Sequence, residues 1–316
     1  MSVVLAHTVV SPDRSERPAV DSPEVDSPAV SFSAFGSPAV DLRALGYSYA
    51  GTRHQVVADL DLTVPAGGHL AVVGRSGCGK STLLSLIAGL EEPATGTAAV
   101  LGDRRPEQRL ASCALMPQGD SLLPWLSVLD NVAISLRNQG ASRRDARAAA
   151  HAMLDRVGLA AWARARPAAL SGGMRQRAAL ARALLARKPV LLADEPLAAL
   201  DAITRAEVQQ WLRTSIAATT ATTGPSAIAT TPTTPTTLVT VTHDVDEALL
   251  LAERVVLLAR PEPAAPARIT ATWSGWFGDD RPREDLVGDP DFAATRQSIL
   301  RALAHPGIMP PSGEVA

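Results

Sequence analysis

A glycine-rich loop carries the clearest chemistry in this sequence. Gly74-Arg-Ser-Gly-Cys-Gly-Lys-Ser-Thr82 fits the pattern G-x-x-x-x-G-K-[ST]. In such a loop Lys80 reaches the β- and γ-phosphates of a nucleotide, and the Ser81 hydroxyl binds Mg²⁺. Lys80 is one of only two lysines among 30 basic residues, so a compact ammonium occurs where arginine would be too bulky. We expect all the loop residues to contact a nucleoside triphosphate: Gly74, Arg75, Ser76, Gly77, Cys78, Gly79, Lys80, Ser81 and Thr82.

The residues on either side of this loop predict the elements that position it. His69-Leu-Ala-Val-Val73 is typical of a buried strand, and Ser81-Thr-Leu-Leu-Ser-Leu-Ile-Ala88 of a helix. The positive end of the helix dipole would then face the phosphates. A strand, a glycine-rich loop and a helix in this order support the prediction of a phosphate site.

Polar residues in three later segments belong to the same chemistry. Leu170-Ser171-Gly172-Gly173 precedes a predicted helix over 171–185, where a serine hydroxyl and free glycyl N–H groups favour phosphate binding over an ordinary turn. Asp194 ends a buried apolar strand over 189–194, at the sheet edge where open α/β sheets bind ligands, and is suited to hold Mg²⁺ through water. His243 follows a second predicted strand, over 238–242.

Taken together, these motifs resemble the ATP-binding subunits of ABC transporters over roughly residues 40–260. The family's markers occur in order: the phosphate loop, Gln118, Leu-Ser-Gly-Gly (170–173), Leu-Leu-Ala-Asp-Glu (191–195), Ala-Leu-Asp (199–201) and Thr-His (242–243). The resemblance implies an α/β P-loop NTPase core of the RecA type, with an antiparallel β subdomain and an inserted α-helical signature subdomain. It also implies ATP and Mg²⁺ as cofactors.

The resemblance assigns roles to the motif residues. Glu195 would polarise the attacking water, His243 would donate to the γ-phosphate, and Gln118 would bind Mg²⁺ through its amide oxygen. Lys80, Glu195, His243 and Gln118 are therefore the catalytic candidates, and Ser81, Gln118 and Asp194 the metal candidates. In this family two subunits enclose two ATP molecules. This implies that the 171–173 motif, Ser171, Gly172 and Gly173, contacts the partner's nucleotide, and that Asp201, counted among the ATP-binding residues, contacts the opposing subunit near the phosphate.

Adenine needs a flat side chain for stacking. Tyr47 and Tyr49 are the chain's only tyrosines, and both precede the phosphate loop, where the family places such an aromatic residue. Tyr49 stands directly before Ala50-Gly51, which is the more familiar spacing. We therefore prefer Tyr49, with Tyr47 as the alternative.

Composition predicts where the folded domain begins and ends. Residues 1–37 hold near-copies of Ser-Pro-Ala-Val and read as a disordered tail. The ATP-binding domain is predicted over 38–262, with its helical subdomain at about 117–182 and a Thr-rich insertion over 214–237, which holds eleven threonines. A Pro-rich segment and a terminal helix beginning at Asp289-Pro290 occupy 263–316.

Periodicity places the remaining elements. Short strands are predicted over 40–45, 57–64, 96–101 and 111–116, and helices over 127–166. In the helical region we expect one apolar face from Val128, Val132 and Leu136, and another from Ala148, Ala152, Leu154 and Val157. The segment 261–288 reads as irregular. The terminal helix should bury Phe292, Ile299, Leu300 and Leu303.

The function indicated by these observations is energy coupling in an ABC importer. The run Gly119-Asp-Ser-Leu-Leu-Pro-Trp-Leu-Ser-Val-Leu-Asp-Asn-Val132 is similar to that of importers of nitrate, sulfonates and taurine. The partners would be a second copy of the chain, integral membrane permease subunits and, indirectly, a solute-binding protein, which places the chain peripherally at the cytoplasmic face of the cell membrane. A net charge of −2 argues against nucleic acid. An exporter subunit or a soluble ABC ATPase remains the alternative, whereas a small-molecule kinase would not need the motif at 170–173.

Overall fold

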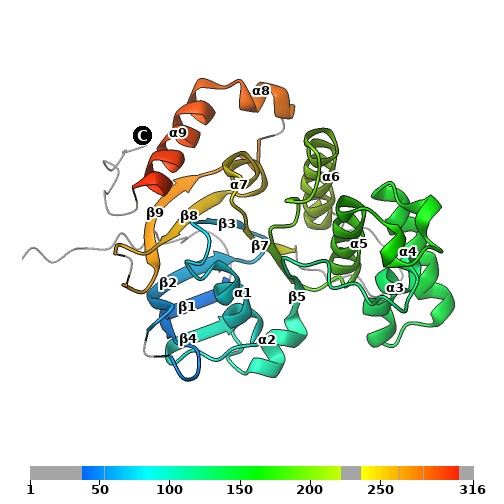
Figure 1. The fold of residues 1–316 in the computed structure, drawn as a ribbon, viewed down its shortest axis with the longest axis horizontal. Helices are drawn as coiled ribbons and strands as arrows, with labels where there is room; N and C mark the ends of the chain where they lie inside the picture. The colour runs from blue at the N-terminus through cyan, green and yellow to red at the C-terminus, as the bar shows by residue number, and fades with distance from the viewer. Residues whose placement is uncertain (1–37, 53, 222–235, 263, 280, 306–316) are drawn as a thin grey trace, which may run out of the picture. The chain divides into compact units, whose positions relative to one another are not determined.

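Two β-sheets organise the part of the chain that the structure describes (Figure 1). This computed structural model describes residues 38–52, 54–221, 236–262, 264–279 and 281–305. The predicted tail over 1–37 lies outside these ranges, as do residues 222–235 of the Thr-rich insertion.

The larger sheet has six strands in the order β5-β6-β7-β3-β8-β9. All neighbours pair in parallel except β8 and β9, which are antiparallel. The predicted strand over 111–116 is shorter than expected, because Ala111 and Ser112 end the helix α2. The strands are β3 (His69–Val73), β5 (Cys113–Met116), β6 (Val190–Asp194), β7 (Thr237–Val241), β8 (Arg254–Ala259) and β9 (Arg268–Ser274).

The apolar runs in these strands are continuous because both faces of the sheet are covered. In β6, Val190 and Leu192 belong to one buried cluster, while Leu191 and Ala193 belong to another on the opposite face. Side chains alternate between the faces of a strand, so a strand packed on both sides cannot show polar alternation.

The smaller sheet has the order β2-β1-β4 and is antiparallel, as predicted for the β subdomain. Helix α1 packs its leucines into the same buried cluster as strands of both sheets. The cluster therefore joins the two sheets around the helix that follows the phosphate loop. The elements are β1 (Pro38–Tyr47), β2 (Val57–Pro65), β4 (Thr95–Val100), α1 (Lys80–Ala88) and α2 (Pro106–Ser112).

A helical region follows β5, as predicted, and lies to one side of the larger sheet (Figure 1). Serine side chains accept hydrogen bonds at the N-termini of its three α-helices, from the backbone N–H of Asp130, Asp145 and Met174. The elements are α3 (Val128–Asn138), α4 (Arg143–Arg156), α5 (Gly172–Leu185) and two 3₁₀ turns, Ala160–Trp162 and Pro167–Ala169.

The predicted apolar face of α4 is partly wrong. Ala148 and Ala152 are exposed, whereas Ala146, Ala150 and Leu154 are buried. The buried positions are separated by four residues and so lie on one face of the helix. Five alanines in this helix made several registers equally apolar, so the sequence did not distinguish them.

Part of the predicted insertion is regular structure. Helix α6 (Ala202–Ala221) continues well past residue 214, and Thr237 already belongs to β7. The Thr237 hydroxyl accepts the backbone N–H of Gly67 at 2.9 Å. Threonines in 214–221 thus extend a helix whose earlier turns are fixed by tertiary packing, which outweighs their weak helix propensity.

The segment 261–288 is not irregular throughout, because β9 and α8 (Arg283–Val287) form within it. β9 has few buried side chains and no clear alternation, so its sequence lacked the usual strand pattern. It forms because β8 offers it a free edge, with pairs from Arg254–Ser274 to Ala259–Arg268.

The terminal helix α9 (Pro290–Ala304) begins as predicted, with the Asp289 side chain accepting the N–H of Asp291 at 2.8 Å. Phe292 is fully buried beside Trp276, and Ile299 is also buried, but Leu300 is exposed. The helix packs against α7 (Val245–Leu251) and β8.

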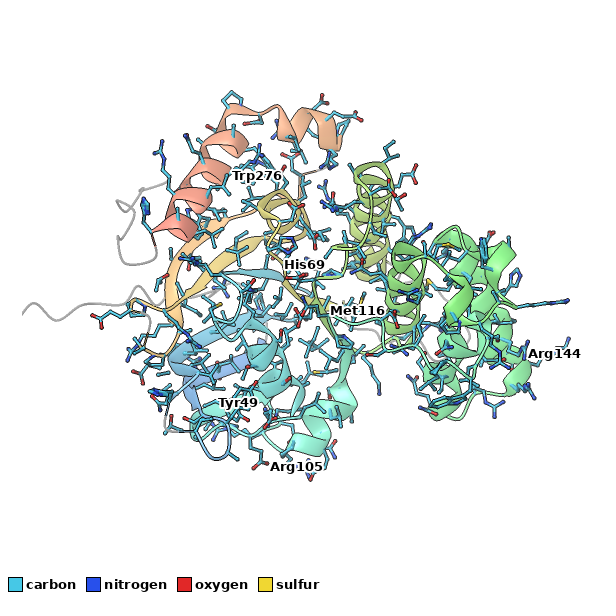
Figure 2. The ribbon with its side chains drawn as sticks, in the orientation of Figure 1. Tyr49, His69, Arg105, Met116, Arg144 and Trp276 are labelled. Carbon is cyan, nitrogen blue, oxygen red and sulfur yellow. The ribbon has the colours of Figure 1, made fainter. Side chains whose placement is uncertain are left out.

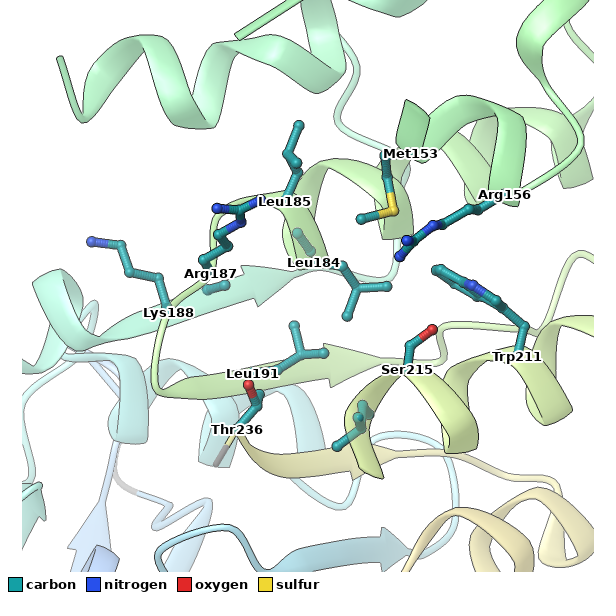
Figure 3. A pocket seen from close by; sticks show the side chains of 13 residues that line it. Met153, Arg156, Leu184, Leu185, Arg187, Lys188, Leu191, Trp211, Ser215 and Thr236 are labelled. Atoms are coloured by element: carbon teal, nitrogen blue, oxygen red, sulfur yellow. The ribbon is translucent and has the colours of Figure 1, made fainter. Parts of the chain in front are cut away.

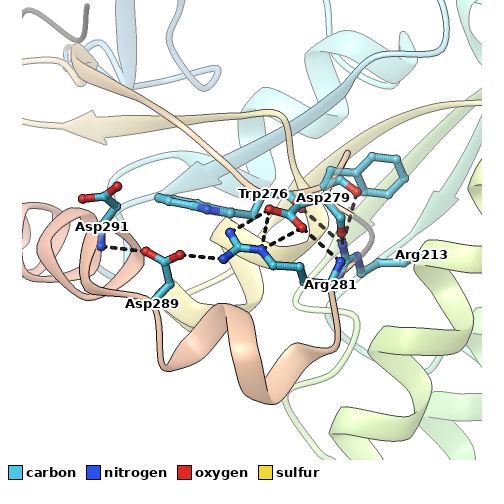
Figure 4. Close-up of polar contacts among 7 residues, drawn as sticks. Arg213, Trp276, Asp279, Arg281, Asp289 and Asp291 are labelled. Carbon is cyan, nitrogen blue, oxygen red and sulfur yellow. Dashed lines mark hydrogen bonds and ion pairs between the residues drawn. The ribbon is translucent and has the colours of Figure 1, made fainter.

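An ion-pair network borders this helix (Figure 4). Arg281 contacts Asp279 and Asp289, at 2.8 and 2.7 Å. Arg213 of α6 donates to backbone carbonyls of the same turn, those of Trp276, Phe277 and Asp279. The guanidinium groups thereby fix the chain between β9 and α8 against α6.

Candidate nucleotide site

The motif residues gather because their strands are parallel and end at the same edge of the sheet. β3 leads into the phosphate loop, β6 ends at Asp194, and β7 ends just before His243. β5, at the end of the sheet order, is followed closely by Gln118. Residues more than a hundred positions apart in the sequence therefore meet at one edge, where open α/β sheets bind ligands.

The phosphate loop is held in shape by its own lysine and by β8. Lys80 Nζ donates to the carbonyl oxygens of Gly74 and Arg75, at 2.8 and 3.2 Å. A Cβ at Gly74 would lie 2.3 Å from the Leu258 carbonyl oxygen, so the loop requires glycine there. Gly77 and Gly79 have φ of 77° and 108°, which other residues rarely adopt.

Arg260, which follows β8, donates to the Gly77 carbonyl at 3.1 Å. Its guanidinium adds positive charge next to the loop, and no motif in the sequence had indicated a role for it. Cys78 is buried, and burial raises the pKa of its thiol, so this cysteine remains a neutral packing group near pH 7.

Asp194 and Ser81 meet beside Lys80. Asp194 is buried at the end of β6, and burial raises the pKa of its carboxyl, while the hydrogen bond from Ser81 and the charge of Lys80 lower it. Among the described residues, no three His, Cys, Asp or Glu side chains are grouped to hold a metal by themselves. One carboxylate and one hydroxyl nevertheless fit Mg²⁺, which takes few protein ligands and completes its shell with substrate phosphates and water.

Glu195 lies between two other predicted site residues. Its Oε1 is 3.2 Å from His243 Nδ1, and its Oε2 is 3.4 Å from Gln118 Nε2. The structure therefore brings together residues that follow three different strands. His243 is largely exposed, with 64% of its side chain accessible, against 17% for Glu195.

The backbone at Glu195 has a φ of 51°, in the left-handed region. Such a conformation persists in a non-glycine residue only where the surroundings hold it. The Glu195 N–H donates to Val241 O at 2.7 Å, and its carbonyl accepts Gln176 Nε2 at 2.6 Å. Both of its backbone groups are thus fixed by neighbouring elements.

Gln176 is a site residue that the sequence analysis missed. This buried side chain of α5 also accepts the Ala199 N–H at 2.6 Å, so it spans the loop after Glu195. A polar residue on an otherwise alanine-rich buried helix face was the available signal, because buried amides are kept where they make hydrogen bonds.

The two tyrosines differ sharply in environment. Tyr47 is buried, and its hydroxyl donates to Glu91 at 2.7 Å. Tyr49 is 45% exposed and lies beside the phosphate loop, with its hydroxyl 2.8 Å from Thr82 Oγ1 (Figure 2). Only the Tyr49 ring has a face open to solvent and near the loop, which favours Tyr49 over the alternative Tyr47.

The remaining predicted residues lie apart from the phosphate loop. Ser171 caps α5 through its hydroxyl, which accepts the Met174 N–H at 3.3 Å, and Asp201 accepts the Thr204 N–H at 3.0 Å. Ser171, Gly172 and Asp201 are exposed. Within the described residues, no hydrogen bond or ion pair joins the 171–173 turn to the phosphate loop of the same chain.

A cavity of about 220 Å³ occurs elsewhere, between α4, α5, β6 and α6, where Trp211, Met153 and Arg156 face one another (Figure 3). None of the candidate nucleotide residues lines it.

Comparisons with known proteins agree with this geometry. The family described as ABC transporter matches residues 57–198. The chain is 42% identical over 265 residues to "Aliphatic sulfonates import ATP-binding protein SsuB 3" of Pseudomonas savastanoi pv. phaseolicola, covering 82% of this chain and 84% of that protein. It is 39% identical to "SsuB 1" of Paracoccus denitrificans, covering 84% and 94%.

This chain is an ABC transporter ATP-binding protein. A solved structure of similar fold is the dimeric, post-hydrolysis state of the ATP-binding cassette MJ0796 bound to ADP and Pi. That structure is 25% identical, covers 74% of this chain and 98% of its own, and has a TM-score of 0.63. The predicted fold, a P-loop NTPase core with antiparallel and helical subdomains, is confirmed.

One exposed aromatic residue of this ABC protein stands out in the segment after Gln118. Trp125 is 66% exposed, at the start of the helical region.

Among the described helices, none is long and apolar enough to cross a lipid bilayer.

Proposed function

We propose that this protein hydrolyses ATP as the energy-coupling subunit of an ABC importer. The single observation that carries the proposal is the position of the Glu195 carboxylate, between His243 and Gln118 and next to Asp194 on the sheet edge that holds the phosphate loop. An acid placed there can accept a proton from, and orient, a water molecule directed at the γ-phosphate.

The other residues provide charge and position. Lys80 neutralises charge on the β- and γ-phosphates, and His243 donates to the γ-phosphate. Ser81, Asp194 and Gln118 would hold Mg²⁺, which supplies further positive charge to the phosphate oxygens when it is bound with ATP. Tyr49 stacks on adenine. Such electrostatic stabilisation is the main contribution that protein groups make to phosphoryl transfer.

A second copy of the chain completes the site. Ser171 and Gly172 are exposed, and within the described residues the 171–173 turn makes no hydrogen bond or ion pair with its own phosphate loop; Asp201 is exposed as well. We infer that Ser171, Gly172, Gly173 and Asp201 act on the nucleotide of a partner copy. The dimeric state named for the similar cassette supports this assembly.

The importer assignment rests on the relatives, whose names specify import of aliphatic sulfonates. We propose sulfonates, taurine or nitrate as the solute class, and permease subunits at the cytoplasmic face of the cell membrane as the direct partners. The exposed Trp125, in the segment that follows Gln118, offers those subunits an apolar contact. A solute-binding protein would act through them, and nucleic acid is not a partner.

Two substitutions test the hydrolytic role. Lys80→Ala should lower ATP turnover by on the order of 10²–10³, because it removes a charge that stabilises the transition state. Glu195→Gln should abolish turnover while ATP stays bound, since an amide cannot take the proton. Phosphate release and ATP binding by the purified chain measure both. Undiminished turnover in Glu195→Gln protein would refute the role of Glu195.

A further inference from the structure

Arg205, in the first turn of α6, connects two loops of the site. Its Nη1 lies 3.0 Å from Asp244 Oδ2, and its Nη2 donates to the Leu200 carbonyl at 3.0 Å. Leu200 directly precedes Asp201, and Asp244 directly follows His243. One planar guanidinium, with 30% of the side chain exposed, therefore holds both loops.

Asp244 is fixed from the other side as well. Its Oδ1 accepts the Glu247 N–H and caps α7, at 3.1 Å, while its own N–H donates to Thr242 Oγ1 at 3.1 Å. A displacement of Asp244 thus moves the turn that carries His243. The Arg205 N–H also bonds the Asp201 carbonyl, at 2.8 Å, so the arginine is attached to the Asp201 loop by its backbone and its side chain.

We propose that Arg205 is a positioning residue that couples the Asp201 loop to His243. The proposal rests on the proposed function, in which Asp201 meets the second copy and His243 meets the γ-phosphate. Arrival of the partner would fix the Asp201 loop, and the Arg205–Asp244 contact would carry that constraint to the histidine. Hydrolysis would then be fast only in a completed dimer.

A neighbouring ion pair provides a matched control. Arg296 of α9 contacts Asp246, two residues beyond Asp244, at 2.9 Å, and its partner carboxylate is similarly half-buried. This arginine contacts the same helix, α7, but within the described part of the chain it makes no hydrogen bond or ion pair with the Asp201 loop. Arg296→Gln removes the same chemical group from a carboxylate at the start of the same helix, α7, without touching the proposed connection.

The experiment measures kcat, the KM for ATP and the thermal unfolding temperature of the full chain. The variants are Arg205→Gln, Arg205→Lys, Asp244→Asn, the double variant Arg205→Gln/Asp244→Asn and the control Arg296→Gln. Asn caps helices as well as Asp, so Asp244→Asn keeps α7 intact. We expect kcat to fall about 10-fold in each Arg205 or Asp244 variant, while the KM for ATP stays within about 2-fold of the original value. The losses in the single variants should be similar, because residues that act as a unit lose their effect together. The double variant should be no more than about 2-fold slower than the slower single.

In a Glu195→Gln background, Arg205→Gln should leave ATP-driven dimerisation unchanged, since Asp201 remains. Arg205→Lys keeps the charge but cannot make both contacts, so it should lose turnover without loss of stability. Three results would each overturn the coupling role. One is a loss of kcat in Arg296→Gln equal to that in Arg205→Gln, and another is a double variant whose loss is the product of the two single losses. The third is a fall in kcat that follows the fall in unfolding temperature across the variants.

A parallel Lys80→Ala sample separates this proposal from the proposed function. If the Lys80→Ala protein is inactive but the Arg205→Gln protein is fully active, only the coupling role of Arg205 is wrong. If the Lys80→Ala protein is active, the proposed hydrolytic function itself is wrong.

Discussion

At the scale of single residues, the site depends on how the backbone presents Glu195. Its left-handed φ of 51° turns the carboxylate from the end of β6 toward His243. Gln176 and Val241 hold its carbonyl and N–H in place. The strain is therefore balanced by contacts from α5 and β7, and a change in either element alters the position of the acid.

Tyr49 provides a prediction at this scale. Tyr49→Ala should weaken ATP binding by about 1–3 kcal/mol, because the stacking surface for adenine is lost. Titration of the purified chain with a fluorescent ATP analogue measures the change. Tyr49→Phe keeps the ring but loses the contact with Thr82, so it should bind nearly as well as the original.

An equal loss of affinity in Tyr49→Phe would assign the effect to the hydroxyl and contradict stacking. Tyr47 offers no equivalent surface, because it is buried against Glu91.

The sequence was informative for residues whose types are unusual in their context. Lys80 in an arginine-rich chain and paired acids after an apolar strand were sufficient to predict a nucleotide site, and the structure brings these residues to one edge of the sheet. Gln176, Arg205 and Arg260 were not identified, because their importance comes from which loops they contact. Those contacts join segments far apart in the sequence, and no local pattern encodes them.

At the scale of elements, strands with strong apolar runs were predicted well, and elements that depend on a neighbour were not. β9 forms on the free edge of β8, although its own residues show no alternation. The buried face of α4 was misassigned because five of its 14 residues are alanines spread around the helix, so hydrophobicity did not single out one face. Both errors arise where tertiary packing outweighs local preference.

Helix α9 supplies a prediction at this scale. Phe292 is fully buried and packs near Trp276 at a ring-centroid distance of 5.1 Å, so Phe292→Ala should reduce the free energy of unfolding by about 3–5 kcal/mol. Urea unfolding followed by circular dichroism measures the loss. The nearby ion pairs of Arg281 are accessible to solvent, which screens them, so we expect the apolar contact to dominate.

Leu300→Ala on the same helix is the control, because this exposed side chain should change stability by less than about 0.5 kcal/mol. A loss as large as that of Phe292→Ala would show that α9 packs on a different face.

At the scale of the whole molecule, stability should depend on a buried acid behind the site. Glu247 is 1% exposed, and burial, with smaller contributions from the charges of Asp244 and Glu195, raises the pKa of its carboxyl to about 8. Between about pH 4.5 and 8 the folded chain holds a proton that the unfolded chain has lost. The free energy of unfolding should therefore fall as the pH rises through this window, by up to about 1.4 kcal/mol per pH unit.

Glu247→Gln should remove this contribution, so the stability advantage of the variant should grow from about pH 5 to about pH 8. Denaturant unfolding across that range measures it. The exposed Glu284→Gln variant should follow the original protein at every pH. A constant difference between Glu247→Gln and the original would mean that Glu247 is ionised in the folded chain.

The position of β6 between two buried clusters has a consequence for durability. Val190 and Leu192 are anchored on one side of the sheet and Leu191 and Ala193 on the other, and the strand ends directly in Asp194 and Glu195. Amide protons in such a doubly covered strand exchange with solvent only when the entire fold opens. The two carboxylates proposed for the site are thus attached to the last part of the protein to unfold, so we expect moderate warming to loosen peripheral helices before it displaces this strand.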